Sequence, residues 1–260
     1  MEVKDKKVIL TGAADGIGKE LTKQLLNKGA FVYGLDINGE KLAKLKDELN
    51  TDRLVTYIVD VSSKENLINF KEQFIKDNGR VDILINNAGI VQPFLNIEDL
   101  QDDVISRVMN VNFYGPMNLC RLFIKDLINN EKGGFIVNVS SMAGFFPFPG
   151  QGIYGASKAA LKIFTEGLYS ELKSKNVGVM IVLPGAIETN ILENSKVEYG
   201  TSKDGSSYKM TSASDAASQI IKGIEKNKFR IFVGGDSKFM NFIYKLNSKK
   251  AISFINKKMG

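Results

Sequence analysis

Tyr154 and Lys158 lie four positions apart in the stretch YGASK, in a chain of 260 residues that contains no histidine. In a helix this spacing places both side chains on the same face. A free tyrosine titrates near about 10, and a neighbouring ammonium group favours its phenolate form. Without histidine, proton transfer depends on Asp, Glu, Lys or Tyr. The pair therefore predicts acid–base chemistry in which Tyr154 exchanges a proton with a substrate oxygen.

The absence of histidine also excludes whole classes of site. Ser-His-Asp and Cys-His mechanisms lose their base, and zinc sites built from His and Cys lose their ligands, so we expect no metal. The single cysteine, Cys120, cannot form an internal disulfide, which suits a reducing compartment. The first ten residues lead into a strand-like segment without a signal peptide, and no apolar run reaches spanning length. We therefore expect a cytoplasmic protein.

A glycine-rich stretch, Thr11–Gly18 (TGAADGIG), follows an apolar segment and precedes a helical one. Glycines at such a turn permit the tight bend and let a ligand approach the backbone, while the helix start offers N–H groups to a pyrophosphate. Asp36, at the end of the next apolar segment, can accept hydrogen bonds from ribose hydroxyls and would repel a 2′-phosphate. Positions 13, 14 and 37 are uncharged. The pattern predicts a dinucleotide site that prefers NAD over NADP; the alternative is that Asp36 only caps the following helix.

Short apolar segments alternate with amphipathic ones along most of the chain, which predicts an α/β protein. We expect a single-domain, Rossmann-like, doubly wound parallel sheet of about seven strands with helices on both faces, spanning residues 1–235. The expected strands are Lys7–Thr11, Phe31–Leu35, Leu54–Val59, Val81–Ile85, Phe135–Val139, Val177–Leu183 and Phe229–Val233. The expected helices are Gly16–Asn27, Gly39–Leu49, Lys64–Asn78, Glu98–Asn129, Gly152–Lys175 and Ala213–Asn227.

Two segments interrupt this alternation. Residues 188–211 are polar, and we expect them to form a strand-free lid over the substrate. Residues 236–260 form a basic tail whose apolar side chains fit one helical face. We expect the tail to pack on its own domain or to complete a neighbour's pocket; peripheral membrane contact is the less favoured alternative.

Together these motifs resemble the short-chain dehydrogenase/reductase family. The resemblance covers Thr11 to about Thr189 and rests on Gly-x3-Gly-x-Gly, on Asn86-Asn87-Ala88-Gly89 after the fourth strand, and on Tyr-x3-Lys. It implies an NAD(P)-dependent oxidoreductase that transfers a hydride between a nicotinamide cofactor and a secondary alcohol or ketone. The alternatives are an epimerase or isomerase that keeps its NAD bound and a non-enzymatic, dinucleotide-responsive binding protein.

The resemblance also implies individual roles. Ser141 would orient and polarise the substrate oxygen, with Ser140 as its rival, and Asn112 would hold a water beside Lys158. Lys158 would bind the nicotinamide ribose and lower the pKa of Tyr154. The catalytic set is thus Asn112, Ser141, Tyr154 and Lys158. The implied cofactor-binding set is Gly12, Asp15, Gly16, Ile17, Gly18, Asp36, Asp60, Val61, Asn87, Ala88, Gly89, Tyr154, Lys158, Pro184, Gly185, Ile187 and Thr189.

Aromatic residues between Ser141 and Tyr154, together with Phe94 and Leu95, favour an apolar substrate such as a lipid-, steroid- or aromatic-like alcohol or ketone. The alternative is that they pack beneath the lid or against another subunit. The helices at 98–129 and 152–175 resemble those of the family's dimer contact, which implies a homodimer or homotetramer. The formal charge is +6, but no basic cluster with interleaved aromatics indicates nucleic-acid binding.

Overall fold

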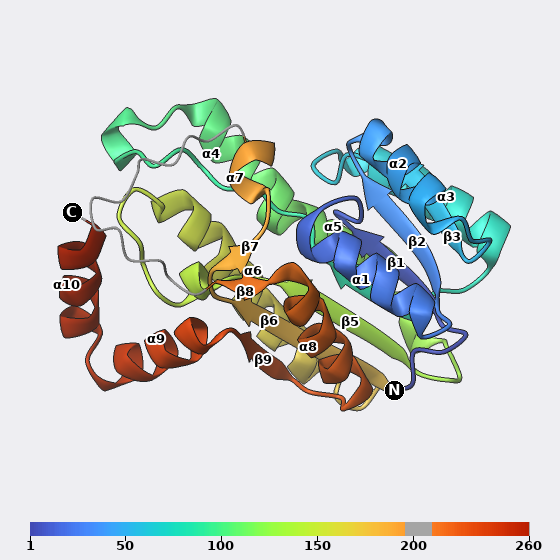
Figure 1. Cartoon of the computed structure of the whole chain (residues 1–260). Coiled ribbons are helices and arrows are strands. Elements are labelled where there is room, and N and C mark those ends of the chain that lie inside the picture. Colours follow the sequence, from blue (N-terminus) through green and yellow to red (C-terminus); the bar gives the residue numbers. More distant parts are fainter. Residues whose placement is uncertain (196–209, 260) are drawn as a thin grey trace.

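The computed structural model describes residues 1–195 and 210–259. Its main sheet has seven parallel strands in the order β3-β2-β1-β4-β5-β6-β9 (Figure 1). The chain order reverses between β1 and β4, and in open α/β sheets such a switch point opens a crevice at the carboxyl ends of the strands. The strands are β1 (Lys7–Thr11), β2 (Phe31–Asp36), β3 (Leu54–Ile58), β4 (Ile83–Asn86), β5 (Gly134–Val139), β6 (Val177–Pro184) and β9 (Arg230–Val233).

Both faces of the sheet are covered by helices, so its central strands are apolar on both sides. Successive side chains alternate between two cores: Val8 and Leu10 lie in one, and Ile9 lies in the other. Helices α1 and α8 pack side by side over the first core, in front of the sheet in Figure 1. The second core is covered by α3, α5 and α6. The helices are α1 (Gly16–Asn27), α2 (Gly39–Leu49), α3 (Lys64–Asn78), α4 (Asp102–Met109), α5 (Gly115–Ile128), α6 (Gly152–Leu172) and α8 (Ala213–Glu225).

The expected fold class is confirmed, and α1, α2 and α3 have the predicted bounds. The single long helix expected at 98–129 is wrong. A 3₁₀ turn, Ile97–Asp99, precedes α4, and a π-helical segment, Asn110–Tyr114, separates α4 from α5. A π segment lengthens a turn without ending the helix, so the overall apolar pattern does not reveal it.

The segment expected to be a strand-free lid carries regular structure at both ends. Strand β7 (Ile187–Glu188) pairs with β8 (Thr211–Ser212), and α7 (Ile191–Asn194) lies between them in the chain. Residues 196–209 lie outside the described part of the structure. The tail forms two helices, α9 (Gly235–Leu246) and α10 (Ser248–Met259), because Asn247 is extended. In the residues that the structure describes, no helix is long and apolar enough to cross a membrane.

Candidate active site

A cleft of about 510 Å³ opens at the carboxyl edge of the sheet, around the ends of β1, β2 and β4. A larger hollow of about 680 Å³ lies at the opposite edge, where none of the predicted site residues lines it. The cleft is lined by every predicted site residue except two, Gly18 and Asn112, which lie behind its wall. The lining members are Gly12, Asp15, Gly16, Ile17, Asp36, Asp60, Val61, Asn87, Ala88, Gly89, Ser141, Tyr154, Lys158, Pro184, Gly185, Ile187 and Thr189.

The three glycines of the first turn are required for different reasons. Gly12 and Gly16 have φ values of +64° and +50°, which side-chain-bearing residues rarely adopt. Gly18 has no such torsion, but a Cβ there would overlap the carbonyl oxygen of Gly12. The turn therefore lies close against the helix, and its bare backbone faces the cleft beside Thr189, whose Cγ2 atom would lie 3.0 Å from a Cβ on Gly16.

Asp36 ends β2 with its carboxylate held by two backbone groups. The Ala14 N–H donates to Oδ2 over 3.1 Å and the Asn38 N–H to Oδ1 over 3.0 Å. The N-cap of α2 is Asn38, whose Oδ1 accepts from the N–H of Lys41. The alternative that Asp36 caps this helix is therefore wrong. A fixed carboxylate and a bare glycine backbone on one cleft wall fit the ribose and pyrophosphate of a dinucleotide.

The end of β4 is tied to the glycine turn. Asn87 donates from its side chain to the carbonyls of Thr11 and Gly12, over 3.1 and 3.2 Å. The backbone N–H groups of Asn87 and Ala88 both donate to the Thr11 hydroxyl over 3.0 Å. These bonds hold the two strands together where they separate to form the cleft. On the next wall, Asp60 accepts from the backbone and hydroxyl of Ser62.

The two neighbouring serines at the end of β5 have different partners. Ser140 is buried, and its hydroxyl donates to the carbonyl of Lys158 over 2.7 Å. Ser141 caps a short 3₁₀ turn, Met142–Gly144, and is hydrogen-bonded to the Tyr154 hydroxyl. The geometry therefore favours Ser141 over Ser140 as the group that acts together with Tyr154.

Lys158 is only 3% exposed, and its Nζ donates to the carbonyl of Val139 over 3.0 Å. Burial lowers the pKa of its ammonium to about 8. A Cβ on Gly89 would lie 3.0 Å from this Nζ, so the glycine leaves room for the lysine to reach the cleft. Lys158 is thus a desolvated amine with one fixed hydrogen bond.

The pKa of Tyr154 departs from the sequence-based expectation. Burial raises it above its ordinary value, and the hydrogen bond with Ser141 acts in the opposite direction. In the protein alone, the pKa of Tyr154 is therefore not lowered as expected from Lys158, because the effect of burial is larger than that of the hydrogen bond with Ser141. A positive charge beside the phenol, such as an oxidised nicotinamide ring, would favour the phenolate.

Comparisons with known proteins agree with this geometry. A model of the family described as short chain dehydrogenase matches residues 6–200. The chain is 35% identical over 195 residues to the 3-oxoacyl-[acyl-carrier-protein] reductase FabG of Thermotoga maritima, covering 74% of this chain and 78% of that one. It is 32% identical over 190 residues to a 3-ketodihydrosphingosine reductase of Bacteroides thetaiotaomicron, covering 73% and 67%.

Solved structures give the same result. A short chain dehydrogenase from Burkholderia cenocepacia in complex with NADP superposes with a TM-score of 0.82 at 26% identity, covering 98% of this chain and 99% of that one. One from Burkholderia phymatum in complex with NAD superposes with a TM-score of 0.81 at 24% identity, covering 89% and 90%. The chain belongs to the short-chain dehydrogenase family. It is an NAD(P)-dependent oxidoreductase of alcohols and ketones.

In this short-chain dehydrogenase, Asn112 is fully buried in the π segment, and its amide is occupied by protein groups. Oδ1 accepts from the Ile90 N–H, and Nδ2 donates to the Ile90 carbonyl, each over 2.9 Å. Nδ2 also donates to the Ser157 hydroxyl over 3.1 Å. Asn112 therefore fastens the chain after β4 to the catalytic helix α6 from behind the cleft.

Gln92 is a positioning residue that the sequence did not reveal. It is 1% exposed, and its Oε1 accepts from the backbone N–H of Tyr154 over 2.8 Å. Its Nε2 donates to the Gly150 carbonyl over 2.8 Å, and its own carbonyl accepts from Gln151 over 3.0 Å. The Gln92 side-chain amide thus pairs backbone groups at the start of α6, and it holds the backbone of Tyr154 in place. Glutamine carries no signal of this role, since its partners lie about 60 positions away.

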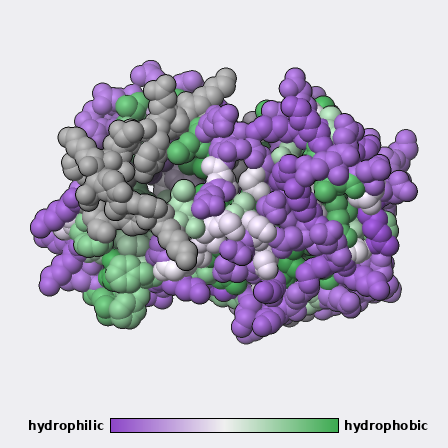
Figure 2. All heavy atoms as spheres, in the orientation of Figure 1, coloured by the Kyte–Doolittle hydropathy of each residue, from purple (hydrophilic) through white to green (hydrophobic). Residues whose placement is uncertain are grey.

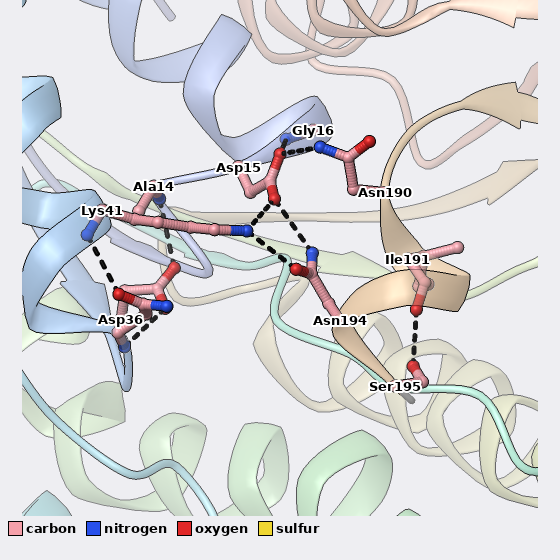
Figure 3. Close-up of polar contacts among 10 residues, drawn as sticks. Ala14, Asp15, Gly16, Asp36, Lys41, Asn190, Ile191, Asn194 and Ser195 are labelled. Carbon is pink, nitrogen blue, oxygen red and sulfur yellow. Dashed lines mark hydrogen bonds and ion pairs between the residues drawn. The ribbon is translucent and has the colours of Figure 1, made fainter. Parts of the chain in front are cut away.

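A second unpredicted feature bridges the mouth of the dehydrogenase cleft (Figure 3). Lys41 Nζ, from α2, lies 2.5 Å from Asp15 Oδ2 and 2.8 Å from Asn194 Oδ1. Asn194 and Asn190 donate to Asp15 over 3.0 and 3.3 Å. Partial burial would raise the pKa of Asp15, but hydrogen bonds from Lys41, Asn194 and the backbone of Gly16, with the charge of Lys41, lower it to about 2. We call these four side chains, Asp15, Lys41, Asn190 and Asn194, the clasp.

In the described residues, the aromatic segment after Ser141 does not line the cleft. Phe146 is fully buried against Met240 of α9 and Ala251 of α10, and its ring contacts Phe148 and Tyr244. These aromatics thus support the tail of their own chain.

Proposed function

We propose that this enzyme interconverts a secondary alcohol and a ketone on an apolar, lipid-like carbon chain, using NAD, with Tyr154 as the proton donor and acceptor. The observation that carries the proposal is the placement of Ser141, Tyr154 and Lys158 at one end of a cleft whose other end holds Asp36. When bound, the nicotinamide ring would supply the hydride acceptor or donor.

The roles of the three side chains follow from their contacts. Ser141 would donate to the substrate oxygen and hold it beside the Tyr154 hydroxyl, with which it already shares a hydrogen bond. Tyr154 would take the proton from an alcohol or return it to a ketone. Lys158, fixed by the Val139 carbonyl, would present its ammonium to the phenol and the nicotinamide ribose. No metal takes part in this proposal.

The preference for NAD rests on Asp36. Its carboxylate is held in the cleft wall by two backbone N–H groups and retains lone pairs for ribose hydroxyls. Lys41, which also lines the cleft, is paired with Asp15 in the clasp. Asp36→Ala should raise the Kd of NAD about 10- to 100-fold, because NAD loses charge-assisted bonds to its ribose, and should leave that of NADP unchanged or lower it, because a repulsion with the 2′-phosphate is removed. Equal losses for both cofactors, measured by calorimetry, would argue against the preference.

The apolar substrate is supported by the two relatives, which are named for ketones on acyl and sphingoid chains. Ile90, Val91 and Val111 give the cleft apolar walls. We propose in addition a homodimer or homotetramer in the cytoplasm, where the buried Cys120 stays reduced. Burial raises the pKa of its thiol to about 12, so it is a poor nucleophile.

Replacement of Tyr154 with phenylalanine tests the proposal. Tyr154→Phe should lower kcat by about a thousandfold or more, since it removes the acid–base group, while NAD affinity stays within about twofold. Tyr169→Phe, at a partly exposed tyrosine of the same helix, is the matched control and should keep full activity. The assay is NADH absorbance with secondary alcohols and ketones of graded chain length, run with NAD and with NADP. A Tyr154→Phe enzyme with full turnover would refute the mechanism.

A further inference from the structure

One face of α9 is apolar and exposed. Phe239, Phe242 and Leu246 are 55%, 61% and 70% exposed, and their spacing places them on the same side of the helix. Figure 2 shows apolar side chains gathered at the lower left of the molecule, where α9 lies in Figure 1. Large apolar side chains are rarely grouped on a surface that faces only water. We call Phe239, Phe242 and Leu246 the α9 face.

The opposite side of α9 is firmly attached to the domain. Met240 is buried among the aromatic residues that follow Ser141. The Ser237 hydroxyl, which is fully buried, donates to the Leu183 carbonyl over 2.8 Å, and Asp236 accepts from the Ala186 N–H over 2.7 Å. The helix therefore cannot turn to bury the α9 face against its own domain without breaking these contacts.

Positive charge is concentrated around this face. Of the 35 Lys and Arg residues in the chain, six lie in residues 236–260, but only one of the 29 Asp and Glu residues does, namely Asp236. These 25 residues thus carry +5 of the formal charge of +6, and the remaining 235 carry +1. Lys238 and Lys245 lie on α9 next to the α9 face, and Lys249 and Lys250 start α10; all four are exposed.

We propose that the α9 face is a docking surface for an anionic lipid bilayer, with α9 lying in the plane of the membrane interface. An exposed apolar helix face bordered by lysines has the chemistry that such an interface recognises. Aromatic and aliphatic side chains enter the headgroup region, and each nearby lysine is attracted by anionic headgroups. A second copy of this chain fits less well, because a two-fold contact through α9 would bring the lysines of both copies together.

The start and the inner side of α9 lie close to the catalytic cleft, whereas the α9 face is on the exposed side of the same helix. α9 begins two positions after β9, and Asp236 holds the backbone beside Pro184 and Gly185, which line the cleft. The inner side of α9 supports the segment that follows Ser141. Binding at the bilayer would therefore bring the cleft close to lipid-like substrates. Only this delivery role rests on the proposed function; the docking itself does not.

Vesicle sedimentation tests the docking directly, without substrate or cofactor. The full chain is mixed with vesicles of phosphatidylcholine alone or with about 30% phosphatidylglycerol, at low and high salt. We expect at least about tenfold stronger partitioning onto the anionic vesicles at low salt, and most of this gain should be lost at high salt. Equal partitioning onto the two vesicle types would overturn the proposal.

Variants distinguish vesicle binding through the α9 face from nonspecific binding by other exposed side chains. Phe242→Ser with Leu246→Ser, and separately Lys238→Glu with Lys245→Glu, should each weaken anionic-vesicle binding about tenfold or more. The matched controls are Ile97→Ser with Ile163→Ser, at side chains 64% and 63% exposed, and Lys44→Glu with Lys64→Glu. The controls should bind vesicles as the wild type does; losses equal to those of the α9 variants would refute the proposal.

Two further readouts remove the remaining ambiguity. Circular dichroism and NAD binding should be unchanged in the α9 variants, since the α9 face makes none of the cleft contacts described above. Sedimentation velocity measures oligomer size. If the Phe242→Ser/Leu246→Ser variant formed a smaller species than the wild type, and the wild type did not bind vesicles, the α9 face would be a contact between copies. That result would overturn the proposal. Vesicle binding with no dehydrogenase activity would leave docking intact and count only against the proposed reaction.

Discussion

The cofactor side of the cleft and the C-terminal tail are built in different ways. Around the glycine turn, the backbone itself forms the contacts: Gly18 lies against Gly12, and Asn87 and Thr11 bind main-chain groups. The tail is attached by side chains, in a cluster whose buried members, among the described residues, are Phe146, Met240 and Ala251. The first region is held by hydrogen bonds to backbone groups, whereas the second leaves the α9 face exposed. We infer that the rigid cofactor side is built mainly from backbone contacts, and the proposed docking surface from side chains.

The largest test of this difference is Gly18→Ala. The new methyl group would overlap the Gly12 carbonyl, and neither backbone segment can retreat without opening the turn. We expect a loss of more than about 4 kcal/mol in unfolding free energy, or failure to fold, together with loss of NAD binding. Urea denaturation and calorimetry measure the two effects.

Gly167→Ala is its control. Gly167 is an exposed residue inside α6, and a Cβ there would meet no atom within 4 Å. Alanine should stabilise the helix there by up to about 1 kcal/mol. If both substitutions were tolerated equally, the close backbone packing of the cofactor side would not matter for its stability.

A second pair of variants compares the two regions through side-chain packing. Leu21→Ala, in the large core under α1, should lower the unfolding free energy by about 3 kcal/mol. Met240→Ala, in the small cluster under α9, should lower the unfolding free energy of the whole domain less. It should instead allow α9 and α10 to unfold locally. Limited proteolysis near Asn247 should then cut Met240→Ala faster than Leu21→Ala, while NAD affinity stays within about twofold. Coupled loss of NAD binding in Met240→Ala would show that the two regions unfold together.

The difference between local and long-range contacts explains which features could be predicted from the sequence. The glycine turn and the strands around it follow from local rules, so α1, α2 and α3 have the predicted bounds. All the expected site residues except Gly18 and Asn112 line one cleft, because parallel strands end at a shared edge. Gln92, Lys41 and the packing of Phe146 could not be predicted, since each depends on contacts with residues distant in sequence. The raised pKa of Tyr154 was missed because burial is a property of the fold.

Lys158, which lines the cleft, gives a pH-dependent test of its burial. Its ammonium has an ordinary pKa of 10.5, which burial lowers to about 8, so between these values the unfolded chain binds a proton that the folded chain has lost. Stability must therefore rise with pH over this window. Between about pH 7.5 and 9.5, the wild type should gain about 2 kcal/mol relative to Lys158→Met. A constant difference between the two proteins would mean that Lys158 is solvated in the folded state.

The smallest expected effect concerns the clasp, in which side chains bridge the mouth of the cleft. Lys41 and Asp15 are 37% and 23% exposed, and such ion pairs contribute about 0.2–1 kcal/mol. The clasp joins the start of α1 to α2 and α7 across the cleft mouth, so we expect it to open when the cofactor leaves. Lys41→Met and Asn194→Ala should each speed NADH dissociation about two- to fivefold in stopped-flow displacement, and the double variant should add little. Lys44→Met, on the same helix, should leave the rate unchanged. If the effects of the two substitutions on the dissociation rate were fully additive, Lys41 and Asn194 would act independently. The clasp would then not work as one unit.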